Sequence, residues 1–302
     1  MDMFALVAAF GGGAFGALLG ALPAFIMTGC FALAGALVAA GGGADIGVGF
    51  MAFGSFMGPH VAFAGGVAAA AYAGSRGKLK AGNDIVTALN GLGEADVICV
   101  GGLFGVIGFV ICNLLLMTPL GPITDAVAMT VAISGCIARL AFGKTGLTGK
   151  YTGKEPRVWV TGGKGFTYNL MLGAVVGIAV SFVAASMMKA GVPAAALGVF
   201  PVVCFGFSAI SLIFAQTGFA IPATHHITLP SGLGALAGMA AWGPCGAILG
   251  VLIGILSSLC GDFAANAFNS YNDSHIDPPA VTIFIMTIVV NLIRLAVVQL
   301  NL

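Results

Sequence analysis

Residues 216–243 read QTGFAIPATHHITLPSGLGALAGMAAWG, an apolar stretch long enough to cross a bilayer but interrupted along its length. The interruption contains Pro222, His225, His226 and Pro230. A proline inside a helix removes a backbone hydrogen bond and kinks or breaks the helix. The stretch is therefore predicted to form one discontinuous span, in which two half-helices meet at a polar break.

A second stretch of this kind lies in the first half of the chain, where the apolar residues 46–74 are interrupted at Gly58-Pro59-His60. Uninterrupted apolar runs near the spanning length of about 17–25 residues accompany the two broken stretches. These runs are Phe4–Leu22, Ala24–Ala40, Val97–Met117, Pro122–Phe142, Phe166–Met188, Pro193–Phe214, Pro244–Cys260 and Ala280–Leu300. The sequence thus predicts an all-α polytopic membrane protein with about ten transmembrane helices.

The composition indicates a surface that faces lipid. Hydrophobic residues make up 59% of the chain and charged residues only 7%, with a mean hydropathy of +1.10. A soluble domain carries about 25% charged residues. The net charge of +1 excludes electrostatic binding of nucleic acid. The 48 glycines are expected to let helices pack closely, within the chain or in a homo-oligomer.

Two loops carry most of the basic residues. Arg76, Lys78 and Lys80 lie in one loop, and Lys144, Lys150, Lys154, Arg157 and Lys164 lie in the other. By the positive-inside rule, loops 75–96 and 144–165 are predicted to be cytoplasmic, which places both termini outside a multi-pass protein of the cell membrane. A short surface helix that begins at an Asn83 N-cap is expected in the first loop.

Four short stretches recur in the same order in the two halves of the chain. They are Cys30–Ala34 with Cys204–Ser208, Gly58–Val61 with Thr224–Ile227, Gly101–Val106 with Gly246–Val251, and Cys136–Phe142 with Asn291–Val297. Each half would hold five spans, and an odd number places the halves in opposite orientations. The expected organisation is two inverted five-helix repeats, residues 1–148 and 166–302, each with a broken helix, joined by a basic linker at 149–165.

The polar residues at the two breaks are the first candidates for a binding site. Ionisable groups inside a membrane are costly and often functional, and an imidazole can donate, accept or transfer a proton. The candidate substrate-binding residues are His60, Gln216, Thr224, His225, His226 and Thr228. The structural alternative is that these histidines only satisfy backbone groups that the neighbouring prolines leave unpaired.

A polar stretch after the ninth predicted span gives the second set of candidates. If the helix continues into this stretch, Asp262, Asn266, Asn269 and Asp273 share one face at i, i+4, i+7 and i+11, and His275 and Asp277 follow directly. Such a stripe could coordinate a cation or form an ion or solute path together with the histidine pair. The alternative is a solvated loop with Asn caps and turns.

Two arginines and one aspartate are expected to have structural roles. Arg139 and Arg294 occupy equivalent positions near opposite membrane faces, where they favour snorkelling to the lipid headgroups over binding a carboxylate. Asp125 is expected only to favour the N-terminus of the fifth span. The seven cysteines follow no disulfide or zinc-ligand spacing, so no metal site is expected.

Catalysis is not expected, because no P-loop, HExxH or GxSxG motif is present and the chain has only ten acidic residues. No cofactor or catalytic residue is predicted, and nucleotide or pyrophosphate hydrolysis is excluded. The pattern favours a transporter or channel for a small solute or ion, with its site between the halves near the paired breaks. The alternatives are an ion-translocating or anchoring subunit of a larger membrane complex and, less favoured, a structural membrane protein.

Overall fold

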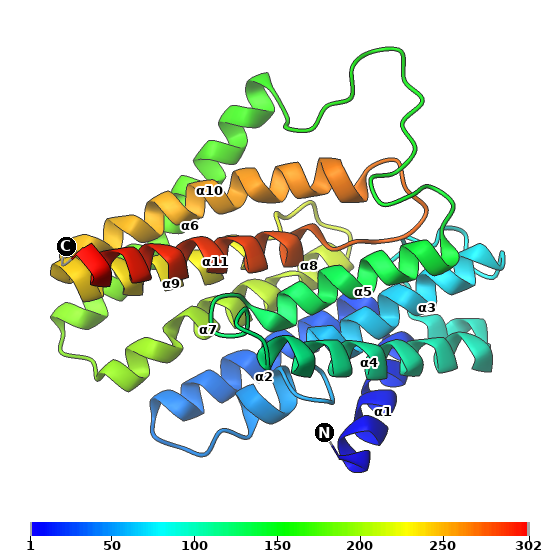
Figure 1. Cartoon of the computed structure of the whole chain (residues 1–302), viewed down its shortest axis with the longest axis horizontal. Helices are drawn as coiled ribbons and strands as arrows, with labels where there is room; N and C mark the ends of the chain where they lie inside the picture. Colours follow the sequence, from blue (N-terminus) through cyan, green and yellow to red (C-terminus); the bar gives the residue numbers. More distant parts are fainter. Residues whose placement is uncertain (1, 301–302) are drawn as a thin grey trace.

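Helices form the whole fold within residues 2–300, the part of the chain that the computed structural model describes, and no strand occurs there (Figure 1). The first half contributes α1 (Met3–Leu19), α2 (Ala21–Ala40), α3 (Ala64–Ser75), α4 (Ala95–Leu116) and α5 (Ala126–Phe142). The second half contributes α6 (Gly163–Lys189), α7 (Ala194–Ser211), α8 (Ile213–Gln216), α9 (His225–Trp242), α10 (Ile248–Ala264) and α11 (Pro278–Leu300). Short π- or 3₁₀-helical segments are η1 (Gly47–Ala52), η2 (Pro59–Phe63), η3 (Leu89–Leu92), η4 (Gly243–Ala247) and η5 (Ala265–Asn269).

Six helical segments are long and apolar enough to cross a membrane. They are Ala21–Ala40, Ala95–Leu116, Gly163–Lys189, Ala194–Gln216, His225–Asn269 and Pro278–Gln299. The segment His225–Asn269 contains both α9 and α10, between which Gly243 has a φ of +63°. Helices α1 and α5 are apolar but have only 17 residues each. The chain is therefore all-helical and compatible with a membrane location.

Helix breaks occur at both predicted places. In the first half η2 begins at Pro59 and continues directly into α3. A proline suits this position because its missing N–H would be unpaired in the first helical turn. In the second half α9 begins at His225, after a non-helical segment that covers residues 217–224. Pro230, which the sequence also placed in the break, lies inside α9 and does not end it.

Glycines determine how closely the helices pack, and the pattern is alike in the two halves. A Cβ atom on Gly13 of α1 would lie 2.7 Å from Gly105 Cα of α4, and one on Gly173 of α6 would lie 2.6 Å from the backbone of α10. Gly29 of α2 and Gly206 of α7 bring these two helices together across the halves. Helix α1 thus packs on α4, α6 packs on α10, and α2 packs on α7.

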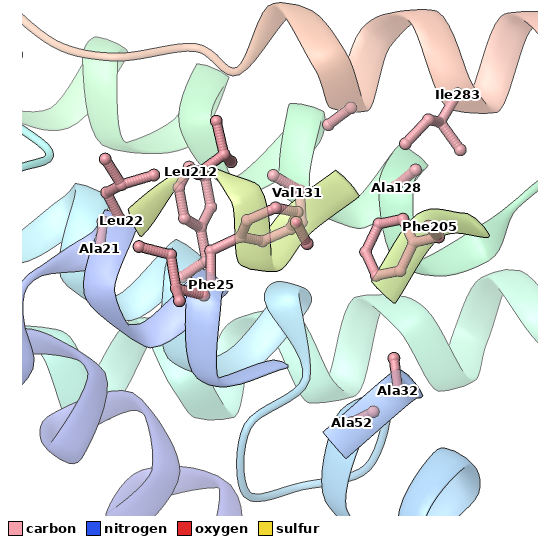
Figure 2. Close-up of a cluster of buried hydrophobic side chains, with 14 of the residues drawn as sticks. Ala21, Leu22, Phe25, Ala32, Ala52, Ala128, Val131, Phe205, Leu212 and Ile283 are labelled. Atoms are coloured by element: carbon pink, nitrogen blue, oxygen red, sulfur yellow. The ribbon is translucent and has the colours of Figure 1, made fainter. Parts of the chain in front are cut away.

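A cluster of buried apolar side chains lies where the two halves meet (Figure 2). It brings together Phe25 of α2, Ala128 and Val131 of α5, Phe205 of α7 and Ile283 of α11. The ring centroids of Phe25 and Phe205 are 5.7 Å apart in an edge-to-face arrangement, the geometry that aromatic pairs prefer. The core is therefore shared between the halves.

The two basic loops leave the helices at the same end of the molecule, on the right of Figure 1, and the C-terminal end of α11 lies at the opposite end. The predicted surface helix in the first of these loops is wrong, because residues 81–88 form turns and bends. The Asp84 carboxylate accepts hydrogen bonds from the backbone N–H groups of Val86 and Thr87. Such a local turn competes with a helix for the same backbone donors.

Arg139 near the end of α5 does not snorkel, so that prediction is wrong. Its side chain is buried, with only 1% of the residue exposed. The guanidinium donates to Leu147 O (2.7 Å), Phe268 O (2.6 Å), Ser274 O (2.5 Å) and Ser274 Oγ (2.9 Å). The connection between α10 and α11 folds over the end of α5 and supplies three of these acceptors. No pattern in the sequence predicts this contact.

Candidate functional site

Four helix starts meet around one cavity of about 40 Å³ between the two halves. Pro59 begins η2 and His225 begins α9, while Asp125 and Asp277 directly precede α5 and α11. All four residues line the cavity, and the remaining wall is mainly aromatic and aliphatic. We refer to this space as the central cavity.

The two aspartates hold equivalent positions. Asp125 Oδ1 accepts the Ala128 N–H at 2.8 Å, and Asp277 Oδ2 accepts the Ala280 N–H at 2.8 Å. Each caps the N-terminus of its helix in the manner that favours Asp, Asn, Ser and Thr there. A buried threonine follows each aspartate by five residues, and its hydroxyl donates to the backbone carbonyl four residues earlier.

Asp125 is a cavity residue that the sequence analysis did not select. The signal was present, because residues 125–130 read DAVAMT and residues 277–282 read DPPAVT. Both fit the pattern D-x-x-A-x-T at the start of the last helix of a half. The different polarity of the preceding connections hides this match when whole hairpins are compared.

The separation of the two carboxylates along the helix axes follows from contacts between α5 and α11. Thr124 donates its hydroxyl to Phe284 O at 3.2 Å, and Asn291 donates to Ile123 O at 2.8 Å. Phe284 lies seven residues beyond Asp277, which is about 10 Å along a helix. Asp125 and Asp277 therefore reach the central cavity at different positions along these two helices.

Aromatic rings surround His225 at the cavity wall. Its ring centroid lies 4.7 Å from that of Phe25 and 5.9 Å from that of Phe205. Phe63 and Phe53 extend this wall through contacts with Phe25 and Phe205, respectively, each with ring centroids less than 6 Å apart. His225 is only 4% exposed and its Nδ1 has no hydrogen-bond partner, which is unusual for a buried polar group.

His275 holds the Asp277 carboxylate in place. His275 Nε2 lies 3.1 Å from Asp277 Oδ1, and its Nδ1 lies 3.1 Å from Asn269 Nδ2. Because a carboxylate only accepts hydrogen bonds, Nε2 donates to Asp277, and the Asn269 amide donates to Nδ1. The contacts of Asn269 with His275 and of His275 with Asp277 thus orient the carboxylate. The sequence had predicted that Asn269 and His275 line an ion or solute path.

A second cavity of about 260 Å³ adjoins the central cavity. The two share Phe25, Phe63, His225 and Asp277 in their walls. The second cavity extends to Ile85 in the first basic loop and to the segment around Ala215–Ala223. It thus lies on the side of the central cavity that faces the basic loops, and the shared residues separate the two spaces.

The other histidines at the breaks do not line either cavity. His60 is 2% exposed and packs inside the first half, where its carbonyl contacts Gly108 of α4. His226 packs inside the second half, beside Gly261 of α10. The His226 ring is therefore turned towards α10, and His60 is buried within the first half.

The remaining candidates from the second break make local contacts. Gln216 donates to Val86 O at 3.0 Å and so ties α8 to the first basic loop. Thr224 precedes α9 and its carbonyl accepts the Thr228 N–H, while the Thr228 hydroxyl donates to Cys204 O at 3.3 Å. None of these three residues lines the central cavity.

The predicted acidic stripe is divided between a helix and a loop. The helical segment ends at Asn269, so Asp273 lies beyond it. Asp262 accepts the Thr161 backbone N–H at 2.7 Å, and Asp273 accepts the Lys144 backbone N–H at 2.6 Å. Asn266 donates to the carbonyl of Asp262. These side chains fasten the linker between the halves and line neither the central nor the second cavity.

Within residues 2–300, no group of three or more His, Cys, Asp or Glu side chains is placed to hold a metal ion.

Comparison with known proteins identifies a family but indicates no activity. No curated protein and no solved structure matches the chain. A family of unknown function, DUF7973, matches residues 1–155 and, a second time, residues 153–301. Both halves therefore match the same family, and the chain belongs to DUF7973.

Proposed function

We propose that this protein is a membrane transporter or channel for a small solute or ion, and that the central cavity is its binding site. The observation that carries the proposal is the matched pair Asp125 and Asp277, contributed by equivalent helices of the two halves to the wall of one cavity. Sites between internal repeats, built at helix breaks, are typical of secondary transporters. The second cavity would be the route from the basic-loop side to this site.

The proposal includes two inverted repeats of five spans each. Its support is the equivalent packing of α1 on α4 and of α6 on α10, together with the two matches to one family. In the first half the crossings would be α1, α2, η2 with α3, α4 and α5. In the second they would be α6, α7 with α8, α9, α10 and α11. Helices of 17 residues reach about 25 Å, close to the thickness of a thin bilayer core.

The proposed orientation is tested with a native cysteine. Cys245 is exposed and lies between α9 and α10, at the end opposite the basic loops. We expect a membrane-impermeant maleimide to label Cys245 in intact cells. A cysteine introduced by Lys150→Cys, in a Cys245→Ser background, should react only after permeabilisation. Labelling of both sites before permeabilisation would contradict the proposed topology.

Transport is tested by flux into vesicles that contain the purified protein. The panel comprises inorganic ions, small organic acids, amides and amines, and we expect uptake of one class above that of empty vesicles. Ala128→Phe should abolish this uptake, because Ala128 lines the central cavity and the substitution adds a phenyl ring to its wall. Leu140→Phe is the matched control, since Leu140 lies on the same helix but is 67% exposed.

The outcomes separate the proposal from its main alternative. Uptake that Ala128→Phe blocks and Leu140→Phe preserves would support a route through the central cavity. Uptake that both variants preserve would place the route elsewhere. No uptake for any member of the panel, in monodisperse protein, would favour an ion-translocating or anchoring subunit of a larger complex, for which co-purification of a partner is the next measurement.

A further inference from the structure

We infer that the central cavity selects a small monovalent cation, of alkali-metal or ammonium size. This inference rests on the proposed function and names the substrate class of the same site. It depends on four properties of the cavity: its charge, the hydrogen bonds that its carboxylate oxygens already accept, its aromatic wall and its volume.

The charge of the lining excludes anions and disfavours neutral solutes. Asp125 and Asp277 both line the central cavity, and among the described residues of its wall and of the second cavity there is no Lys or Arg. An anion would meet two carboxylates without any compensating charge. A neutral solute would leave an ionised carboxylate uncompensated in a mainly apolar space, which is costly. A cation compensates them directly.

The carboxylate oxygens favour a single over a double charge. Asp125 Oδ1, Asp277 Oδ1 and Asp277 Oδ2 already accept hydrogen bonds from Ala128, His275 and Ala280. Ca²⁺ requires six to eight oxygen ligands, and Mg²⁺ requires an octahedral set. The cavity cannot supply either number from its side chains, and an incomplete ligand set costs a monovalent ion less because its charge is half as large.

The wall adds two features that point to a ligand. Phe25 and Phe205 lie beside His225, and Phe63 lines the same cavity. Aromatic faces attract cations, especially where water is excluded. The His225 ring also lines the cavity while its buried Nδ1 has no hydrogen-bond partner. With its proton on Nε2, this imidazole can accept a hydrogen bond from a cation at Nδ1 or coordinate it there.

The volume limits the size of the ion. The central cavity measures about 40 Å³, and one water needs about 10–15 Å³ of such space. It therefore holds about three water-sized particles, enough for a monovalent ion with one or two waters. Sugars, amino acids and bulky organic cations do not fit.

The test is ligand-dependent thermal stability of the purified full-length protein. Chlorides of sodium, potassium, ammonium and methylammonium replace N-methylglucamine chloride at constant ionic strength, so that only the small cation varies. A ligand that binds only the folded state raises the melting temperature in a saturable manner. We expect saturation with at least one small cation, and the order of half-saturating concentrations identifies the preferred one.

Asparagine substitutions test where the cation binds. Asp125→Asn and Asp277→Asn remove the charge but keep a good N-cap, so the fold should persist. We expect each to raise the half-saturating concentration by about tenfold or more. Asp2→Asn is the matched control, because Asp2 caps α1 by accepting the Ala5 N–H and lies on the surface.

A second pair of variants tests the aromatic wall without touching the carboxylates. Phe205→Leu should raise the half-saturating concentration several-fold. Phe207→Leu, on the same helix, should leave it unchanged because Phe207 is 70% exposed. A cation response that persists in Asp125→Asn, Asp277→Asn and Phe205→Leu would overturn the inference.

Thermal-stability measurements with the wider set of ions, acids, amides and amines used for uptake also separate this inference from the proposed function. Stabilisation and uptake of a neutral solute or an anion, blocked by Ala128→Phe, would overturn the cation assignment and leave the transport proposal standing. Absence of any stabilisation and any uptake across the whole panel would overturn both.

Discussion

Arg139→Met is expected to lower the melting temperature by about 6 °C, because a loss of about 4 kcal/mol in a chain of this size corresponds to such a shift. The guanidinium is buried and donates to three backbone carbonyls and one hydroxyl. Methionine fills a similar volume but leaves these acceptors without partners. Each buried acceptor that loses its donor costs about 1–3 kcal/mol.

The matched control for this experiment is Arg294→Met. Arg294 holds the corresponding position in the second half, but its side chain is exposed. Exposed substitutions usually change stability by about 0.5 kcal/mol or less. Melting of the purified variants, followed by fluorescence and by size-exclusion chromatography, measures both effects. Equal melting temperatures for the two variants would show that the hydrogen bonds of Arg139 do not stabilise the fold.

Gly16→Ala is expected to destabilise the protein by about 3 kcal/mol or to prevent folding, since overpacking against backbone cannot be relieved by a rotamer change. A Cβ atom at Gly16 would collide with the backbone of Ala62 in η2, including its carbonyl oxygen. To accept the methyl group, α1 would have to move away from the broken span. The half-helix that begins at Pro59 would then lose its support.

Gly11→Ala in the same helix is the matched control and should have the opposite sign. No atom lies within 4 Å of a Cβ built at Gly11. Alanine is favoured over glycine inside a helix by about 1 kcal/mol, so this variant should be neutral or slightly stabilised. Thermal melts and expression levels of the two variants test the pair. A stable Gly16→Ala protein would mean that α1 and η2 are not held in close contact.

The positions of the helix breaks are predictable from the sequence because proline has a local effect on the backbone. Gly58-Pro59 precedes η2, and the segment around Pro222 stays non-helical up to His225. Pro230 shows the limit of this reasoning. It is the sixth residue of α9, where a proline removes one backbone hydrogen bond. A helix buried among other helices tolerates this loss because its neighbours can satisfy the freed carbonyl.

The roles of the polar side chains could be predicted only in part. His225 lines the central cavity, whereas the adjacent His226 is turned towards α10, a difference set by helix rotation rather than by residue type. The contacts of Asp262 depend on where the linker passes the end of α10, and the sequence around Asp262 does not specify this. Asp125 was recognisable through the repeated D-x-x-A-x-T pattern, a signal shorter than the apolar runs around it.

The partners of Arg139 have a consequence for biosynthesis. Its hydrogen bonds to Ser274 join residues 135 positions apart, so α5 leaves the ribosome well before the acceptors on Phe268 and Ser274 exist. At about 5–20 residues per second, translation must continue for roughly 7–27 s before this guanidinium can be enclosed. During that interval the charge has to remain in water at the end of the helix. The first half of the chain therefore reaches its final packing only when the second half is nearly complete, and a nascent chain arrested before Ser274 should remain accessible to proteases at the end of α5.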